Sequence, residues 1–402
     1  MTSVGVIGAG VMGSGIAQLA ASHACAVVLS DVSEDVVRKG VSSIAKALDR
    51  QVEKKKLSAA ERDQIIGRIQ IAASPADFKT SDLVIEAVAE KLEIKLAAFG
   101  AIKPHVGRET VFASNTSSLS ISQIGAGLGE PRRVVGMHFF NPAPVMPLVE
   151  IIKGKESDPS AVERVADIAR GWGKTVVHAK DTPGFIVNRV ARGYYLESLR
   201  MLSEGIAGVE EIDRIMRDRG GFRMGPFELM DLVGIDVNYS VSESVWQQLG
   251  KPARLRPNPI QANLYQRGEL GRKSKRGFFA YDSDPPAPTV KSPHKELSVA
   301  PDVAEAVQTF ASAAATKPGT ALQNYVFSRP LIAILNEAAF AFDDGVATKA
   351  DIDTAMRLGT NYPRGPWEWI AKIGVENCRR LLQALNSSVG DGRFTAAKSL
   401  SE

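Results

Sequence analysis

Short apolar runs separated by helical patterns mark the first part of the chain. Val4–Ile7 and Ala26–Ser30 are two such runs, and a glycine-containing segment with a helical pattern lies between them. Two further runs, within residues 82–88 and 110–114, are separated in the same way. Buried parallel strands have this continuous apolar character because helices cover both faces of their sheet. The pattern predicts an α/β domain with a parallel sheet, to which Val176–His178 adds a last strand.

A helical hairpin longer than a plain crossover is predicted over residues 33–69. The pattern is helical from Ser33 to about Lys56, and Ser58 and Glu61 have the spacing of a capping box that opens a second helix. Three lysines lie at the tip of this hairpin: Lys54, Lys55 and Lys56. Such a charge run is most often only solvated, and the functional alternative is a contact to a phosphorylated part of a substrate.

Beyond residue 181 the chain is predicted to be helical. We expect Thr182 to cap a helix with Pro183 at its first position, and helices to continue to about Gln248. Six prolines within residues 285–320 predict a linker. The expected organisation is a dinucleotide-binding domain, a first helical domain, a linker and a second, degenerate helical copy, over residues 1–181, 182–284, 285–320 and 321–402.

The helical part of the chain repeats itself without a gap at a constant offset of 140 residues. The second copy carries Ser328 where the first has Asn188, so we interpret it as structural. We expect residues 321–386 to pack on residues 183–248 as an intramolecular pseudo-dimer. Further oligomerisation stays open. The matched pairs include Arg189 and Arg329, Glu197 and Glu337, Asp213 and Asp353, Gly225 and Gly365, and Glu228 and Glu368.

The segment after the first strand has the fingerprint of a dinucleotide-binding loop. Gly8 allows a tight turn, Gly10 lets a pyrophosphate approach the backbone, and Gly13 lets helix and strand pack closely. Asp31 ends the second strand, where a carboxylate accepts from ribose hydroxyls and repels a 2'-phosphate. The sequence therefore predicts NAD rather than NADP. The alternative, a tight turn that binds no nucleotide, is the less common outcome for this order of elements.

A histidine and a glutamate are predicted to face each other across a turn. Three prolines between Pro142 and Pro147 exclude a sheet interior and indicate a turn between two β-rich pieces. If these pieces pair about Pro144, positions whose numbers add to 288 are opposite, as His138 and Glu150 are. A carboxylate on one imidazole nitrogen makes the other a base near neutral pH. The alternative is a buried histidine that a structural acid satisfies.

The composition narrows the functional class. Hydrophobic residues make up 44% and charged residues 23% of 402 residues, which is ordinary for a globular enzyme. The net charge of +4 is small and scattered, so we expect no nucleic-acid partner. Apolar runs are interrupted by polar residues, and no membrane span is expected. Cys25 and Cys378 lack metal-ligand spacing, so we expect no metal and favour a reducing cytoplasm.

With these motifs in view, the chain resembles the L-3-hydroxyacyl-CoA dehydrogenase family over nearly its whole length. The match rests on the glycine loop, on Ser114–Ser118, on His138-Phe-Phe-Asn-Pro, on Asp181–Arg189 and on the closing segment Gly271–Tyr281. The resemblance implies an NAD-binding Rossmann domain followed by an all-α domain. It also implies reversible, NAD-dependent oxidation of L-3-hydroxyacyl-CoA in β-oxidation of fatty-acid or phenylacetate type, with an acyl-CoA substrate.

The resemblance also assigns roles to residues. It implies His138 as the general base toward the substrate 3-hydroxyl, Glu150 as its orienting partner, and Ser117 and Asn188 as hydrogen-bonding partners of the substrate oxygens. Lys54 to Lys56 look similar to the family's contact with the CoA phosphates. The expected cofactor site comprises Gly8, Gly10, Val11, Met12, Gly13, Asp31, Ala87, Glu90, Lys95, Asn115 and Asn141.

Two rival functions stay open at this point. One is an NAD-dependent dehydrogenase of a free 3-hydroxy acid, which would not need the lysine tip. The other is a non-catalytic structural relative that keeps the NAD fold, against which the intact set of four polar residues argues. The acyl length cannot be read from the sequence. Arg223 could meet a distal carboxylate, although an exposed arginine is more often only solvated.

Overall fold

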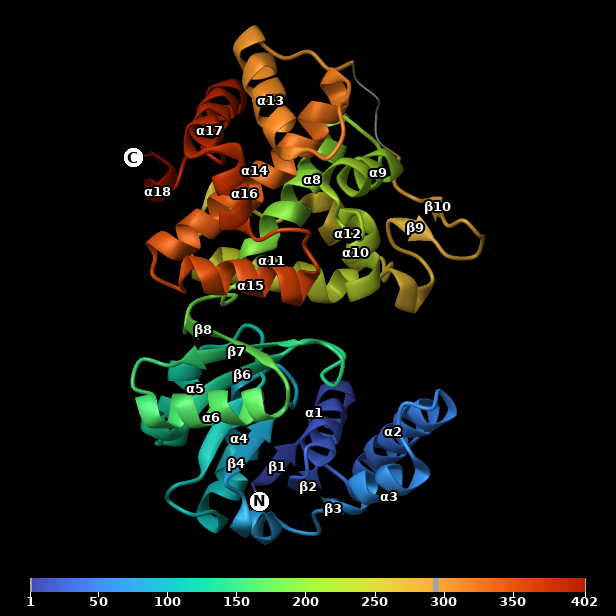
Figure 1. The fold of residues 1–402 in the computed structure, drawn as a ribbon, viewed down its shortest axis with the longest axis vertical. Coiled ribbons are helices and arrows are strands. Elements are labelled where there is room, and N and C mark those ends of the chain that lie inside the picture. The colour runs from blue at the N-terminus through green and yellow to red at the C-terminus, as the bar shows by residue number, and fades with distance from the viewer. Residues whose placement is uncertain (1, 292–295, 402) are drawn as a thin grey trace. The chain divides into compact units, whose positions relative to one another are not determined.

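The computed structural model describes residues 2–291 and 296–401. The chain divides into two compact units, Met1–Phe185 and Ile186–Glu402 (Figure 1). The first unit is a sheet covered by helices, and the second is built mainly of helices. This agrees with the predicted Rossmann-type domain followed by a helical region.

An eight-stranded sheet forms the first unit, in the order β3-β2-β1-β4-β5-β6-β7-β8. Strands β1 to β6 run parallel, β7 pairs antiparallel with β6, and β8 pairs parallel with β7. The short edge strand β3 was not predicted. The strands are β1 (Ser3–Ile7), β2 (Ala26–Ser30), β3 (Ile69–Ile71), β4 (Leu83–Glu86), β5 (Val111–Ser114), β6 (Val134–Phe139), β7 (Leu148–Lys153) and β8 (Thr175–Lys180).

The crossovers of the first unit are helical. Helices α2 and α3 form the predicted hairpin, and the Ser58–Glu61 capping box that opens α3 is present. Helix α1 begins at Val11, directly after the glycine loop, rather than near residue 14. The helices are α1 (Val11–Ser22), α2 (Glu34–Glu53), α3 (Ala59–Gly67), α4 (Leu92–Ile102), α5 (Ile121–Leu128) and α6 (Pro159–Gly171).

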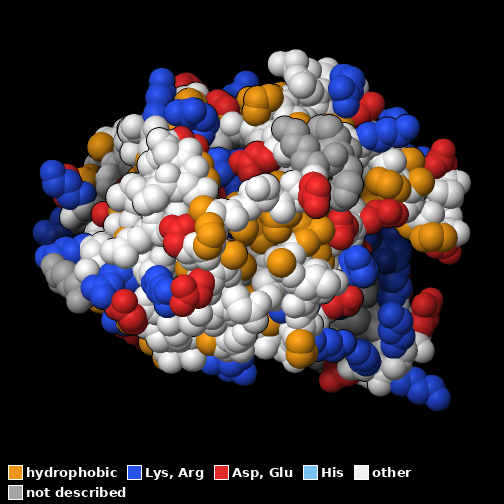
Figure 2. All heavy atoms as spheres, turned by 90° about the horizontal axis from the view of Figure 1, so that it is seen from above, with side chains coloured by type: hydrophobic (Ala, Val, Ile, Leu, Met, Phe, Trp, Pro, Cys, Tyr) orange, Lys and Arg blue, Asp and Glu red, His pale blue; other side chains and the backbone are white. Residues whose placement is uncertain are grey.

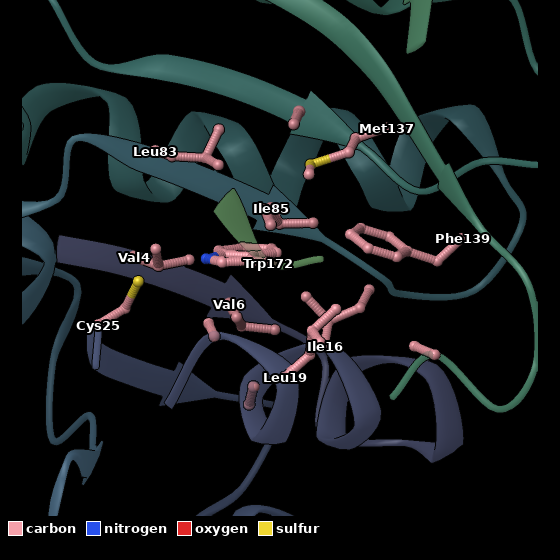
Figure 3. Close-up of a cluster of buried hydrophobic side chains, with 14 of the residues drawn as sticks. Val4, Val6, Ile16, Leu19, Cys25, Leu83, Ile85, Met137, Phe139 and Trp172 are labelled. Carbon is pink, nitrogen blue, oxygen red and sulfur yellow. The ribbon is translucent and has the colours of Figure 1, made fainter. Parts of the chain in front are cut away.

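An apolar core joins the sheet to the helices on one of its faces. Val4 on β1 and Ile85 on β4 lie beside the ring of Trp172, and Val6 on β1 lies near Ile16 of α1 (Figure 3). All of these side chains are buried. Burying such side chains is worth about 1.5–3 kcal/mol each, so this core fixes the sheet whose carboxyl edge carries the polar residues.

The second unit begins differently from the expected helix entry. Gly184 and Phe185 have positive φ values of 78° and 47°, which a helix cannot include, so α7 begins at Val187 and Thr182 is not its cap. The helices are α7 (Val187–Val190), α8 (Arg192–Glu204), α9 (Val209–Gly220), α10 (Pro226–Val233), α11 (Ile235–Gln248), α12 (Pro259–Gln266), α13 (Pro301–Ala314), α14 (Ala321–Asp343), α15 (Lys349–Thr360), α16 (Pro366–Ile373), α17 (Val375–Val389) and α18 (Lys398–Ser401).

The expected linker contains a packed helix. Within residues 285–320, α13 buries Val303, Val307 and Phe310 and lies against α14 and α17. The prolines misled the prediction because Pro301 occupies the first turn of α13, where a missing N–H costs nothing. Before this helix, β10 (Ala287–Pro288) pairs with β9 (Phe279–Ala280). Residues 292–295 of the predicted linker lie outside the described residues.

In the second unit α14 packs against α7 and α8, and reciprocal ion pairs join it to both helices. Arg189 Nε lies 2.7 Å from Glu337 Oε1, and Arg329 Nε lies 2.7 Å from Glu197 Oε1. The four residues are at most 2% exposed. At the 140-residue offset, Arg329 matches Arg189 and Glu337 matches Glu197. The arginine of each segment therefore binds the glutamate of the other segment. This is the exchange that a two-fold axis produces.

Helices α8 and α14 touch where this axis would pass. A Cβ atom added to Gly193 would lie 2.6 Å from the Ile334 nitrogen and 2.7 Å from the Ala333 carbonyl carbon. Ala333 is the residue that matches Gly193 at the offset. A larger residue at position 193 would therefore separate the helix backbones and stretch the ion pairs.

A second structural feature also occurs twice. The Asp213 carboxylate accepts from the amides of Phe227 and Glu228 and so caps α10. At the offset of 140 residues, the Asp353 carboxylate accepts from Trp367 and Glu368 and caps α16. The sequence match therefore extends to local hydrogen bonding.

The acid stability of the second unit should depend on Glu197. Burial opposes ionisation of this carboxyl, but Arg329, Arg200 and Arg393 outweigh burial and hold its pKa at about 2, below the ordinary 4.5. A lowered folded-state pKa gives stability that is complete above pH 4.5 and is lost as the pH falls toward 2. The shift corresponds to about 3 kcal/mol.

We expect Glu197→Gln to be less stable than the wild type at pH 6 and the difference to shrink steadily below pH 4.5. Urea unfolding of both proteins at several pH values measures this. Glu305→Gln is the control, because Glu305 forms an exposed ion pair with Arg380. A stability difference that stays constant down to pH 2.5 would contradict the assignment.

The surface carries charges of both signs. Basic and acidic side chains are interspersed on the face in Figure 2, around a group of apolar side chains, which agrees with the net charge of +4. Within the described residues, every helix is too short or too polar to cross a bilayer.

Candidate active site

The glycine loop after β1 fits a dinucleotide. Gly8 has φ +102°, and a Cβ atom on it would lie 2.7 Å from the Ala87 carbonyl oxygen. A Cβ atom on Gly13 would lie 1.8 Å from the Gly8 oxygen, so α1 packs on the loop only with glycine there. Around Gly10 nothing lies within 4 Å of such an atom. The loop is thus closed toward the sheet and open at the N-terminus of α1, where a pyrophosphate binds in such folds.

Asp31 stands beside this loop at the end of β2. Its Oδ2 accepts from the Ala9 amide at 2.6 Å, which ties the strand end to the glycine loop. Val11 and Val32 are 75% and 94% exposed next to it, and such exposed apolar side chains suit an aromatic ligand ring. Met12 is half-buried in α1. These observations fit the adenosine half of NAD.

Glu90 organises the loop that follows β5. Its Oε1 accepts from the Thr116 hydroxyl at 2.6 Å and from the amides of Ser117 and Ser118 at 2.8 and 3.0 Å. Burial raises the pKa of Glu90, but the charge of Lys95 and these donors outweigh it and lower the pKa. The ionised carboxylate therefore holds Ser117 in place at the carboxyl edge of the sheet.

The Lys95 side chain is enclosed by two carboxylates inside the first unit. It is 1% exposed, and Nζ lies 2.9 Å from Glu86 Oε1 and 3.1 Å from Glu90 Oε2. Glu86 is fully buried and also accepts from the Ser114 hydroxyl. The ammonium group therefore acts inside the protein, where it fixes Glu90. The sequence analysis missed Glu86 and Ser114 as the supports of this loop.

His138 and Glu150 lie opposite each other in the β6–β7 register, as predicted. His138 Nδ1 is 2.6 Å from Glu150 Oε2. The Glu150 side chain is fully buried and that of His138 is 8% exposed. The rings of Phe140 and Phe185 lie 4.6 and 5.9 Å from the imidazole. The geometry sets one imidazole nitrogen on a carboxylate in an apolar setting and leaves Nε2 for a second partner.

Two polar contacts that sequence reasoning missed support this pair. Lys174 Nζ donates to the carbonyl groups of Ala143 and Met146 at 2.7 and 2.8 Å, and so holds the proline turn between the two strands. Burial lowers the pKa of Lys174. Asn115 Oδ1 accepts from the Phe139 amide at 2.9 Å and ties the end of β5 to β6. A lysine 24 residues beyond Glu150 offers no local signal for the first contact.

The remaining predicted residues lie in several places. Lys54, Lys55 and Lys56 are exposed at the end of α2, on the hairpin tip. Asn141 is exposed in the proline turn, and Ala87 follows β4 beside Gly8. Asn188 is half-buried in α7, in the second unit. Arg223 is exposed in the same unit and lines a cavity of about 660 Å³.

The chain matches the models of a known family over most of its length. Residues 3–182 match the model of the 3-hydroxyacyl-CoA dehydrogenase NAD binding domain. Residues 184–281 and 325–402 match the model of the C-terminal domain of the same family. The chain belongs to the 3-hydroxyacyl-CoA dehydrogenase family. It is accordingly an NAD-dependent oxidoreductase.

Individual relatives of the family agree. The chain is 36% identical to 3-hydroxyadipyl-CoA dehydrogenase from Escherichia coli K12, over 98% of this chain and 95% of that protein. The crystal structure of 3-hydroxybutyryl-CoA dehydrogenase from the same species is 35% identical, with a TM-score of 0.87. The match covers 99% of this chain and 97% of that one. (S)-3-hydroxybutyryl-CoA dehydrogenase from Ralstonia eutropha is 38% identical, with a TM-score of 0.68, over 70% of this chain and all of that one.

Proposed function

We propose that the His138–Glu150 pair is the acid–base centre of an NAD-dependent oxidation of L-3-hydroxyacyl-CoA to 3-ketoacyl-CoA. The observation that carries this proposal is the 2.6 Å contact between Nδ1 and Oε2 in a buried, apolar setting. A carboxylate on Nδ1 favours the tautomer whose Nε2 accepts a proton, and it stabilises the imidazolium that forms.

The residues divide the work of the reaction between them. His138 Nε2 takes the proton of the substrate 3-hydroxyl, and in the reverse direction the imidazolium returns it. NAD, when bound, supplies the hydride acceptor. Ser117, held by Glu90, donates to a substrate oxygen from the first unit, and Asn188 does so from α7. Both contacts orient the reacting carbon.

We assign the CoA part of the substrate to the basic tip of the α2–α3 hairpin. Lys54, Lys55 and Lys56 carry three positive charges on exposed side chains. Ammonium groups bind phosphates as point charges, and a flexible CoA phosphate needs no more precise partner. The free-acid alternative leaves this tip without a task.

We further propose that residues 321–402 are a second copy of the helical domain of residues 182–284, and that residues 321–386 pack on residues 183–248 as a pseudo-dimer. The reciprocal Arg–Glu pairs, the Gly193–Ala333 contact and the repeated aspartate caps support this proposal. The match to the relative from Ralstonia eutropha covers all of that protein but 70% of this chain. This fits a shorter form without the second copy. Both buried cysteines are free, which is compatible with the proposed cytoplasmic location.

The Glu150→Gln variant tests the acid–base proposal. The neutral amide cannot stabilise an imidazolium. Its NH₂ group can donate to Nδ1, which places the imidazole proton on Nε2, so we expect kcat to fall by about 10²-fold and the pH profile to move. NADH affinity should stay unchanged, since Glu150 is fully buried on β7. The measurement is the initial rate across pH for both proteins. A variant with the wild-type rate and pH profile would refute the role of Glu150.

A further inference from the structure

A buried arginine lies one helical turn beyond Asn188. Arg192 opens α8 and is 3% exposed. Its Nε donates to the Asn188 carbonyl at 2.9 Å, and its Nη1 donates to the Asn238 carbonyl at 3.0 Å and to the Ser242 hydroxyl at 2.9 Å. The guanidinium also lies 4.9 Å from the ring centre of Tyr195. Arg192 therefore connects the backbone of Asn188 to α11.

This arginine is buried without an opposite charge. Nowhere in the described part of the chain does a carboxylate lie within 4.0 Å of its guanidinium, whereas Arg189 and Arg329 in the same unit each bind two. Burial accordingly lowers the pKa of Arg192. A buried charge that only neutral groups satisfy is costly, and apolar residues of similar volume are often as stable or more so. Stability alone gives no reason to keep it.

The matched segment of the chain contains the apolar alternative. At the offset of 140 residues, Ile332, Cys378 and Leu382 stand in place of Arg192, Asn238 and Ser242. All three are at most 1% exposed. The same helical arrangement is thus packed without the polar network. The network is present only in the segment that has Asn188, and it is absent where Ser328 replaces that residue.

The path of the helix differs at the same place. In the first segment the helix is interrupted at Ala191, between α7 and α8, while α14 runs unbroken through the matching positions. The Arg192 guanidinium holds the Asn188 carbonyl at this interruption. Fixing that carbonyl fixes the backbone from which the Asn188 side chain projects.

We propose that Arg192 is a positioning residue that orients Asn188 for its contact with the substrate. The inference rests on the role proposed above for Asn188. A hydrogen-bond donor that is misplaced by about 1 Å can cost up to about 10²-fold in rate, so the arginine acts on turnover rather than on folding.

The Arg192→Met variant tests this directly. We expect kcat to fall by about tenfold to 10²-fold and NADH affinity to stay unchanged. The melting temperature should be the same as that of the wild type or higher. Arg200→Met is the matched control. Arg200 is also on α8, is partly buried, and donates to the backbone carbonyls of Ala253 and Arg254 and to the Glu197 carboxylate, so its loss should lower stability and leave kcat unchanged.

A second variant guards against misfolding. The triple change Arg192→Ile, Asn238→Cys and Ser242→Leu introduces the apolar set of the matched segment. It should fold as well as the wild type and show the same low kcat as Arg192→Met. A well-folded triple variant with the wild-type rate would overturn the proposal.

Combination with Asn188→Ala separates this inference from the proposed function. If Arg192 acts through Asn188, the double variant Asn188→Ala with Arg192→Met is no slower than Asn188→Ala alone. Losses that multiply would show that Arg192 acts on another group, which overturns the inference and leaves the role of Asn188 intact. A wild-type rate for Asn188→Ala alone would refute the role of Asn188 itself and the inference with it.

Discussion

Replacement of His138 by alanine should lower kcat by about 10²- to 10⁴-fold while NADH affinity stays largely unchanged. General acid–base catalysis contributes an effect of this size, and the alanine removes the group that we propose exchanges the hydroxyl proton. Because His138 lies on β6 and the glycine loop follows β1, the cofactor site should keep its shape. Initial rates with saturating cofactor, and fluorescence titration with NADH, measure the two quantities.

His105 provides a matched control for this variant. It lies in a short turn after α4, outside the residues assigned to the site, so His105→Ala should keep the wild-type rate. A His138→Ala variant within threefold of the wild-type kcat would show that another group transfers the proton. A variant that loses NADH affinity together with activity would instead point to a damaged fold.

Removal of the chain after Asp284 should uncover a face of the helical region that is buried in the whole chain. The cut removes α14 and so uncovers α7 and α8, where Arg189 and Glu197 would lose their buried partners Glu337 and Arg329. A buried ion pair that loses one partner costs about 3–5 kcal/mol. The truncated chain can recover both pairs only with another copy, in which Arg189 would face Glu197 of that copy. We expect a dimer or an aggregate in light scattering.

A charge reversal distinguishes this pairing from unspecific association. In the truncated chain, Glu197→Arg places an arginine opposite Arg189 of the other copy, so the specific dimer should not form. Glu210→Arg in the same truncated chain is the control, because Glu210 is exposed on α9. A truncated chain that stays a stable, soluble monomer would contradict the pseudo-dimer.

The sequence predicted those features whose geometry depends on the spacing of residues that are close together in the chain. The His138–Glu150 pair followed from an antiparallel register about one proline turn, and the glycine loop from the order of strand, turn and helix. The constant offset matched Arg189 with Arg329 and Glu197 with Glu337, but it did not predict that these residues form ion pairs with one another. These patterns lie within a continuous stretch of chain or in a gapless repeat.

Features that depend on distant packing were not predicted. Nothing in the segment around Lys95 reveals that Glu86 and Glu90 enclose its ammonium group. The helix α13 was hidden by a proline-rich composition, and only its burial against α14 and α17 decides the issue. The sequence around Arg192 does not reveal that its side chain is buried and binds the carbonyl groups of Asn188 and Asn238 and the hydroxyl of Ser242.

The reduction of acetoacetyl-CoA by NADH, compared with that of free acetoacetate, tests the central claim most directly. The claim is that this chain reduces the 3-keto group of an acyl-CoA with a hydride from NADH and a proton from His138. We predict oxidation of NADH with acetoacetyl-CoA, followed at the reduced-nicotinamide absorbance band, and at least about tenfold lower kcat/KM with acetoacetate, because binding energy from the remote CoA part raises the rate at the reacting carbon. Equal rates with both compounds, or none with acetoacetyl-CoA, would contradict the account.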